Sequence, residues 1–283
     1  MIENHLDIGG GVVFWMLTDD TRRERLQNGL TPLGLEKFLP EPRPDTSILR
    51  EALDEQLGGS RMLIRPLAHK DGFAVVREER GEDQNEYRTE LVARMVAGAL
   101  DLQPWDDRAV AIQESMHAHA RRIPAVQVSQ MLVRLVEHLG GTRLRPSGAV
   151  YWIPGNRLDE WMKIVQAVEQ ASDRPSAVYL LRHQLDTEAV RAVRDAVINE
   201  IEADTSRISA DVLSGELGTR ALETRQQQIE SLREKVLLYE DILSIGLSQL
   251  HQAIDKADQV TVTASLMLST QQSLSAHQMV GQQ

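Results

Sequence analysis

The sequence predicts an α+β protein built from three consecutive parts: an N-terminal mixed α/β domain, a middle winged-helix-like unit and a C-terminal antiparallel coiled-coil helical hairpin. Short apolar runs bounded by glycine and proline indicate strands in the first two parts. Helical periodicities lie between these runs, and the last third carries a heptad repeat without proline. The expected boundaries are 1–100, 104–184 and 185–268, with a flexible tail at 269–283.

The N-terminal domain begins with a strand candidate, Val12–Leu17, which follows three glycines. Two short helices are expected near 21–28 and 45–57, separated by a proline-rich segment. Three further segments, Arg61–Leu67, Gly72–Glu79 and Tyr87–Val96, then predict an antiparallel meander. The third of these segments lacks strict alternation, so a helix is the alternative there.

The middle unit (104–184) has the order αββαβ. Helices are expected at Trp105–Ile123 and Ala125–Leu139, because Pro124 interrupts the first and Gly140-Gly141 ends the second. Two extended runs around Pro146-Ser147-Gly148 predict a β-hairpin, which a further helix and the strand Ala177–His183 follow. Two helices followed by a hairpin is the order of a winged helix.

The C-terminal part (185–268) is predicted to be a hairpin of two long helices that reverses at Ser214–Gly218. The heptad positions of the second helix are mostly apolar or small, namely Leu222, Ile229, Leu232, Val236, Tyr239, Leu243, Gly246, Leu250, Ala253, Ala257 and Val260. A continuous second helix would reach about 60 Å and overhang the first by two to three turns. The repeat serves either packing between the two helices or formation of an oligomer. The candidate interface residues are Leu243, Leu250, Ile254, Val260 and Leu266.

Composition limits the function classes. The formal charge is 31 − 42 = −11, which argues against a protein that coats nucleic acid nonspecifically. The chain has no cysteine, so disulfides and cysteine-based metal or redox chemistry are excluded. Glu3 and Asp7 stand where a signal peptide has basic residues, and the early apolar run is too short to span a membrane. We therefore expect a cytoplasmic protein that is not bound to membranes.

A local basic segment is the candidate nucleic-acid-binding site. Between 121 and 154 the basic residues are Arg121, Arg122, Arg134, Arg143 and Arg145, and Glu137 is the only acid. Arginine suits phosphate because its planar guanidinium donates two parallel hydrogen bonds. A winged helix would place the helix Ala125–Leu139 in the major groove and the hairpin on the phosphates. The alternative is a structural or protein-binding unit, since winged helices also dock proteins.

Metal and catalytic sites are not predicted. His117 and His119 lie about 200° apart on a helix and cannot share a metal, while Glu114 and His117 lack a third ligand. The pairs Asp19-Asp20 and Asp106-Asp107 stand at expected helix starts, where carboxylates accept from free backbone N–H groups. None of the glycine clusters completes a phosphate-binding loop. We expect no cofactor, no metal and no enzyme activity.

A resemblance adds context to these residues. The segment Trp15–Asp20, the run Arg145–Pro154 and the long helical hairpin together resemble a family of uncharacterised proteins. Members occur in phages, mobile elements and bacterial genomes, sometimes encoded beside MoxR-type AAA ATPases. The resemblance implies a mobile-element or antiviral-defence context and an AAA ATPase partner. It supplies no functional residues, because the family has no settled activity.

The function expected from the sequence is that of a non-catalytic assembly or adaptor protein. It would form a homo-oligomer, or dock to a protein partner, through the C-terminal coiled coil. The alternative is a DNA-binding protein that uses the winged-helix-like unit for contact and the helical hairpin for dimerisation.

Overall fold

The computed structural model describes residues 9–59, 61–80, 85–145 and 148–280, and the side chains of 80 and 271–280 are not described. The chain divides into two compact units. Unit 1 comprises 1–15, 133–162 and 178–283, and unit 2 comprises 16–132 and 163–177. This division differs from the three consecutive domains expected, because the N-terminal strand belongs to the same unit as the C-terminal helices. The expectations for the N-terminus and for Pro146-Ser147 lie outside the described residues.

Unit 1 contains a four-stranded sheet in the order β10 (Ala177–His183), β1 (Gly10–Met16), β9 (Tyr151–Pro154) and β8 (Thr142–Arg143). The predicted hairpin is confirmed as the antiparallel pair β8–β9. However, β9 also pairs with β1, where Val12 lies opposite Trp152. The hairpin is therefore part of a larger sheet, unlike the two-stranded wing of the expected unit.

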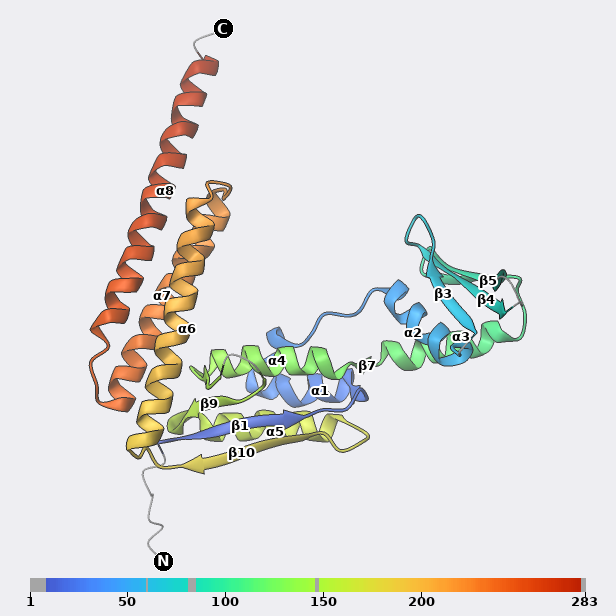
Figure 1. Ribbon diagram of the computed structural model, residues 1–283, viewed down its shortest axis with the longest axis horizontal. Coiled ribbons are helices and arrows are strands. Elements are labelled where there is room, and N and C mark those ends of the chain that lie inside the picture. The colour runs from blue at the N-terminus through green and yellow to red at the C-terminus, as the bar shows by residue number, and fades with distance from the viewer. Residues whose placement is uncertain (1–8, 60, 81–84, 146–147, 281–283) are drawn as a thin grey trace, which may run out of the picture. The chain divides into compact units, whose positions relative to one another are not determined.

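The C-terminal bundle, as we call helices α6 (Thr187–Leu213), α7 (Thr219–Leu243) and α8 (Ser248–Val280), has three helices where two were expected (Figure 1). The predicted second helix stops at Leu243, and Ser244 adopts a left-handed conformation with φ 52°. The chain then turns, and α8 packs back against both α6 and α7. Gly246 thus lies in a turn and not in the heptad repeat. The overhang predicted at 250–268 was wrong for its first part, because Leu250, Ile254 and Ala257 are buried in the bundle. Helix α8 continues to Val280, and the flexibility of the tail from 269 stays a prediction.

The core of the bundle confirms most of the predicted heptad residues, although Gly246 lies outside the helices and Ala253 and Val260 are only partly buried. Buried side chains from all three helices form one cluster with Trp152 of the sheet, among them Val197, Ile201, Ile229, Val236, Tyr239, Leu250 and Ile254. Arg225 occupies the heptad position between Leu222 and Ile229, where the repeat is not apolar, and it forms an ion pair with Asp211 of α6 at 2.8 Å. The interruption therefore replaces an apolar contact between α6 and α7 with a charged one.

Unit 2 contains a four-stranded antiparallel sheet in the order β3 (Met62–Pro66), β4 (Gly72–Arg80), β5 (Asn85–Val96) and β6 (Ala99–Gln103). The predicted meander is confirmed and its third segment is a strand. The fourth strand was missed. Its turn consists of Ala97 and Gly98, whose φ angles of 50° and 79° match a tight hairpin turn of type I′. Helices α2 (Asp45–Leu57) and α3 (Arg108–Ala120) share a buried cluster with this sheet.

The remaining elements of unit 2 are α1 (Arg23–Leu30) and the short pair β2 (Thr21–Arg22) and β7 (Arg122–Ile123). There are also two 3-10 turns, Thr31–Leu33 and Glu36–Phe38. Helices α4 (Ala125–His138) and α5 (Leu158–Ala171) contribute residues to both units, and the 3-10 turn Gly155–Arg157 precedes α5. No helix in the described segments has both the length and the apolar character needed to cross a membrane.

Candidate functional site

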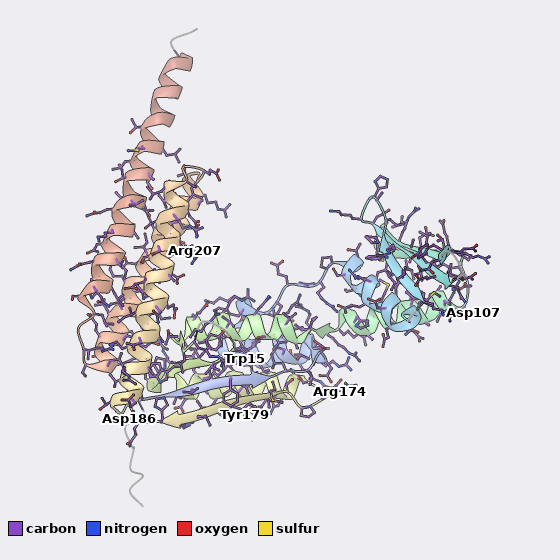
Figure 2. The ribbon with its side chains drawn as sticks, in the orientation of Figure 1. Trp15, Asp107, Arg174, Tyr179, Asp186 and Arg207 are labelled. Carbon is purple, nitrogen blue, oxygen red and sulfur yellow. The ribbon has the colours of Figure 1, made fainter. Side chains whose placement is uncertain are left out.

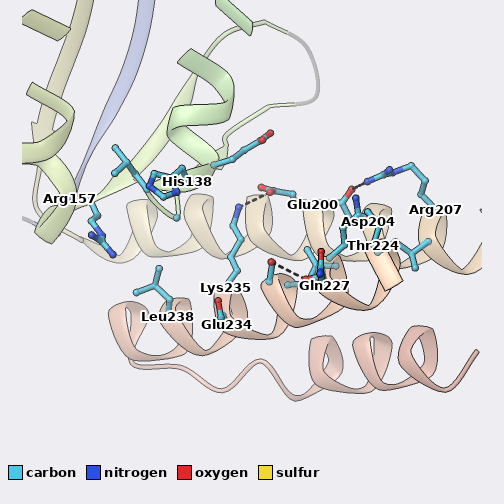
Figure 3. Close-up of a pocket in the computed structure, with 17 residues that line it drawn as sticks. His138, Arg157, Glu200, Asp204, Arg207, Thr224, Gln227, Glu234, Lys235 and Leu238 are labelled. Carbon is cyan, nitrogen blue, oxygen red and sulfur yellow. Dashed lines mark hydrogen bonds and ion pairs between the residues drawn. The ribbon is translucent and has the colours of Figure 1, made fainter. Parts of the chain in front are cut away.

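A polar pocket of about 710 Å³ lies in unit 1 (Figure 3). It is lined by the end of α4, by the middle of α6 and by α7. Its lining carries charges of both signs. The acids are Glu137, Glu200, Asp204 and Glu234, and the bases are Arg157, Arg207 and Lys235, beside His138. Such a lining has no net preference for an anion or a cation.

The central groups of this pocket hold the end of α4. Lys235 donates to the carbonyl oxygen of Gly141 at 2.7 Å and to the Glu200 carboxylate at 2.6 Å. Glu200 also accepts from the Thr142 hydroxyl at 2.5 Å. Tyr239 donates to the carbonyl of Gly140 at 2.9 Å. Gly140 and Gly141 follow the last residue of α4, so Lys235 and Tyr239 satisfy carbonyls of the turn that leaves this helix.

Glu137 is the group in this pocket whose ionisation is perturbed. Desolvation raises the pKa of its carboxyl, and repulsion from the Glu200 carboxylate raises the pKa further. The residue as a whole is nevertheless exposed. Lys235 and Arg143 act on the pKa in the opposite direction. Among the described residues, no group of three His, Cys, Asp or Glu side chains could hold a metal ion.

The predicted nucleic-acid-binding arginines are divided between the two units. Arg121 and Arg122 belong to unit 2, while Arg134, Arg143 and Arg145 belong to unit 1. Arg143 and Arg145 line a second cavity, of about 570 Å³, together with Glu137, Glu200 and Asp204. The Arg143 guanidinium also lies 5.5 Å from the centre of the Tyr151 ring. The acids of this cavity compete with phosphate for the two arginines, so the geometry gives little support to a phosphate-binding hairpin.

The predicted interface residues have different positions. Leu243, Leu250 and Ile254 are buried inside the C-terminal bundle, with exposed fractions of 6%, 0% and 0%. These three contact their own chain and cannot form a subunit interface in this fold. Val260 is half-buried against the same cluster, and Leu266 is 63% exposed. Only the distal part of the predicted set therefore faces solvent.

An apolar groove of about 510 Å³ lies beside this distal part, and we call it the bundle-end groove. It forms where α6 stops and the chain turns away, while α8 continues past the turn (Figure 1). Side chains from α6, α7, α8 and the turn line it, including Val212, Leu213, Leu217, Leu222, Val260 and Met267. None of the described residues that line the groove is charged. Leu213 and Met267 are 73% and 64% exposed, so the groove is an apolar surface open to solvent.

The histidine and aspartate candidates serve local structure. His119 contacts the carboxylates of Glu51 and Glu55 at 3.3 and 3.1 Å. Asp19 accepts from the backbone N–H of Ala125 at 2.8 Å and so caps α4, which is not the helix that follows it in sequence. Asp106 accepts from the backbone N–H of Arg108, the first residue of α3. The capping interpretation is therefore confirmed for Asp106, whereas Asp19 caps a different helix from the one expected.

The sequence interpretation missed Glu200, Thr142 and Lys235 as partners. Lys235 and Tyr239 are four residues apart and share one face of α7, which was a usable signal. Glu200 lies 35 residues from Lys235, and no spacing rule joins them.

The comparison with protein families matches residues 9–273 to a family model described as "Family of unknown function (DUF6744)". The chain therefore belongs to this family. No curated protein matches the chain. No solved structure matches it either. This family is uncharacterised, as is the family that the sequence was found to resemble. Membership in it therefore assigns no activity to the chain.

Proposed function

We propose that this protein is a non-catalytic assembly protein whose copies associate through the end of the C-terminal bundle. The bundle-end groove carries this proposal, because it is apolar, uncharged and open to solvent. Exposed apolar surface of this kind marks a site of protein contact more often than a free surface.

The occupant that fits the groove is the distal part of α8 from a second copy. A charged helix would lose hydration in an uncharged groove without gaining a partner for its charge. From Gln259 to Val280, α8 contains no Lys, Arg, Asp or Glu, while α6 and α7 are rich in charges. Two copies related by a twofold axis would each supply one groove and one uncharged helix end, so a single surface serves both sides of the contact.

Sedimentation velocity at tens of micromolar tests the proposal. The wild-type protein should associate, and Met267→Lys should weaken the association because a lysine ammonium would have to enter the apolar groove. The matched control is Leu237→Lys, since Leu237 is 55% exposed on α7 and does not line the groove. A wild-type monomer at these concentrations would refute the proposal, as would equal effects of the two lysine variants.

The family resemblance adds a context to this proposal. An assembly protein of a mobile element or defence system would present its copies to an ATPase of the AAA class. Affinity purification of the wild-type protein and the Met267→Lys variant with such an ATPase tests whether the bundle end also serves that contact.

Duplex DNA binding is the second candidate function. It is favoured by the exposure of Arg134 and Arg145, and the acids that share a cavity with Arg143 and Arg145 weigh against it.

A further inference from the structure

The last turn of the C-terminal bundle joins α7 to α8 through the short segment 244–247 (Figure 1). Its first residue, Ser244, adopts a left-handed conformation with φ 52°. That conformation is unfavourable for a residue with a side chain, and glycine usually occupies it at the end of a helix. The turn between α6 and α7 follows this rule, because its left-handed residue is Gly215 with φ 72°. The turn into α8 is therefore the more strained of the two.

The buried residues of α7 and α8 would form one stripe if the two helices were continuous. At about 100° per residue, the centres of the two buried stripes would lie about 20° apart, whereas those of α6 and α7 would lie about 80° apart. A turn one residue longer or shorter would rotate the stripe of α8 by about 100°. Chain reversal does not require this match, whereas an amphipathic helix that runs through the turn does. The residues of the stripe are Leu222, Ile229, Leu232, Val236, Tyr239, Leu243, Leu250, Ile254, Ala257 and Thr261.

The helices α6 and α7 hold the bundle to the rest of unit 1. Asp186, labelled in Figure 2, caps the start of α6 shortly after β10. Lys235 and Tyr239 of α7 donate to carbonyls of the turn after α4. Helix α8 instead packs on α6 and α7, where its Asp258 forms an ion pair with Arg233 of α7 at 3.1 Å. Helix α8 can therefore leave the bundle without loosening the sheet.

One side chain holds the turn closed. The Glu240 carboxylate accepts from the backbone N–H of Leu247 at 2.6 Å and lies 3.1 Å from Nε2 of His251. In a continuous helix, residues 240 and 247 would lie about 10 Å apart along the axis, so these contacts would be lost. Glu240 thus favours the closed turn, while the conformation of Ser244 opposes it.

We infer that two copies of this chain exchange α8 by forming a continuous α7–α8 helix. Each α8 then packs on α6 and α7 of the other copy, antiparallel to α7 as in the closed bundle of Figure 1. Buried residues of α8 such as Ile254, which contact their own chain in the closed bundle, contact the other copy after exchange. Such exchange is a low-cost route to a dimer, and short strained hinges favour it. It requires no occupant in the bundle-end groove, so it goes beyond the proposed function.

Cross-linking between two single-cysteine variants measures the exchange. The chain has no cysteine, so Arg233→Cys and Asp258→Cys each carry one thiol. Because these two side chains meet between α7 and α8, a short bismaleimide joins the two variants only when α8 of one copy lies on α7 of the other. Both variants also carry Met267→Lys, which weakens the bundle-end contact. Their mixture at tens of micromolar should give a covalent heterodimer, and each variant alone should not.

Substitutions in the turn test whether this heterodimer contains a continuous helix. Ser248→Pro should abolish it, because proline is tolerated at the first position of α8 but not inside a longer helix. Gly246→Ala should raise the dimer association constant about tenfold, because alanine favours a helix at both turns of the dimer. A Cβ at this position meets no described atom within 4 Å in the closed turn. Ser244→Gly should lower the constant by a similar factor, since glycine adopts the left-handed conformation without strain.

Two results would overturn the inference. One is the absence of the heterodimer from the natural turn, and the other is a heterodimer that Ser248→Pro leaves unchanged. Circular dichroism shows whether each variant keeps its helices. If Ser248→Pro did not fold, the opposite shifts expected from Gly246→Ala and Ser244→Gly would decide, and equal effects of these two would refute the exchange.

Failure of the proposed function gives a different result. Wild type and Met267→Lys would then sediment alike, while the mixed cysteine variants would still form the covalent heterodimer. In that case the exchange of α8 stands and the bundle-end contact falls.

Discussion

A substitution of Ile254 distinguishes a role of α8 in folding from a role in a subunit interface. The sequence alone assigns Ile254 to a subunit contact, whereas the structure buries it completely inside its own bundle. The substitution Ile254→Ala removes three carbon atoms. At about 0.8 kcal/mol for each buried methylene, the lost transfer free energy is roughly 2.4 kcal/mol, and the cavity left behind raises the expected loss of stability to about 3–4 kcal/mol. For a unit of about 150 residues this corresponds to a fall in melting temperature of roughly 6–16 °C.

Thermal unfolding followed by circular dichroism and by tryptophan fluorescence measures this loss, and the two probes together reveal whether the units unfold separately. The control is Val262→Ala on the same helix, where the side chain is 41% exposed and the expected change is small. The oligomeric state of the folded Ile254→Ala variant should equal that of wild type. An unchanged melting temperature combined with loss of association would refute the placement of α8 in the core.

The remaining predictions concern the turn into α8, the polar pocket and DNA. The hydrogen bond from the backbone N–H of Leu247 holds the pKa of the Glu240 carboxyl below its usual value, and the hydrogen bond from the His251 side chain adds to this effect. This stabilisation is present above the ordinary pKa of a glutamate and is lost as the pH falls through the lowered value. Glu240→Gln should therefore melt earlier than wild type near neutral pH, and the difference should vanish in acid; a constant difference across the pH range would contradict this. Lys235→Met leaves Glu200 without its cation and should cost about 1–3 kcal/mol in urea unfolding. Glu200→Gln added to Lys235→Met should recover part of that loss, and no recovery would show that the charge on Glu200 is not the cause. Fluorescence anisotropy with labelled duplex DNA at low and moderate salt tests the second candidate function. If the arginines bind phosphate, saturable binding should weaken with salt and disappear in Arg143→Glu/Arg145→Glu; absence of binding at low salt removes this candidate.

The local periodicities predicted most individual elements. The strand at β10, the helix α2, the end of α4 at Gly140 and the buried positions of α6 and α7 all follow from spacing and from the glycine and proline residues beside them. Each depends on residues close in sequence. The chain reversal after Leu243 was also visible locally, because Gly246 stands inside the heptad repeat, where a glycine is more typical of a helix end.

The arrangement of the elements could not be predicted in the same way. The apolar run in β1 predicts a strand but does not identify β9 and β10 as its neighbours. The same holds for the pocket, where Glu200 meets Lys235 only because α6 and α7 pack side by side. The bundle-end groove depends on where α8 runs relative to the turn between α6 and α7. The sequence analysis expected one continuous helix in place of α7 and α8, so it could not predict this position.

The place of β1 in the centre of its sheet sets an order of events during synthesis on the ribosome. Gly11 pairs with Ile153, and the other neighbour of β1 begins at Ala177. The first strand therefore leaves the ribosome long before either neighbour exists, while the α2–β6–α3 region between them can already fold. A nascent chain at that stage carries an apolar strand without a sheet, and a chaperone that binds short apolar segments would find it there. Release of the strand must await synthesis of β9 and β10, which end at Pro154 and His183.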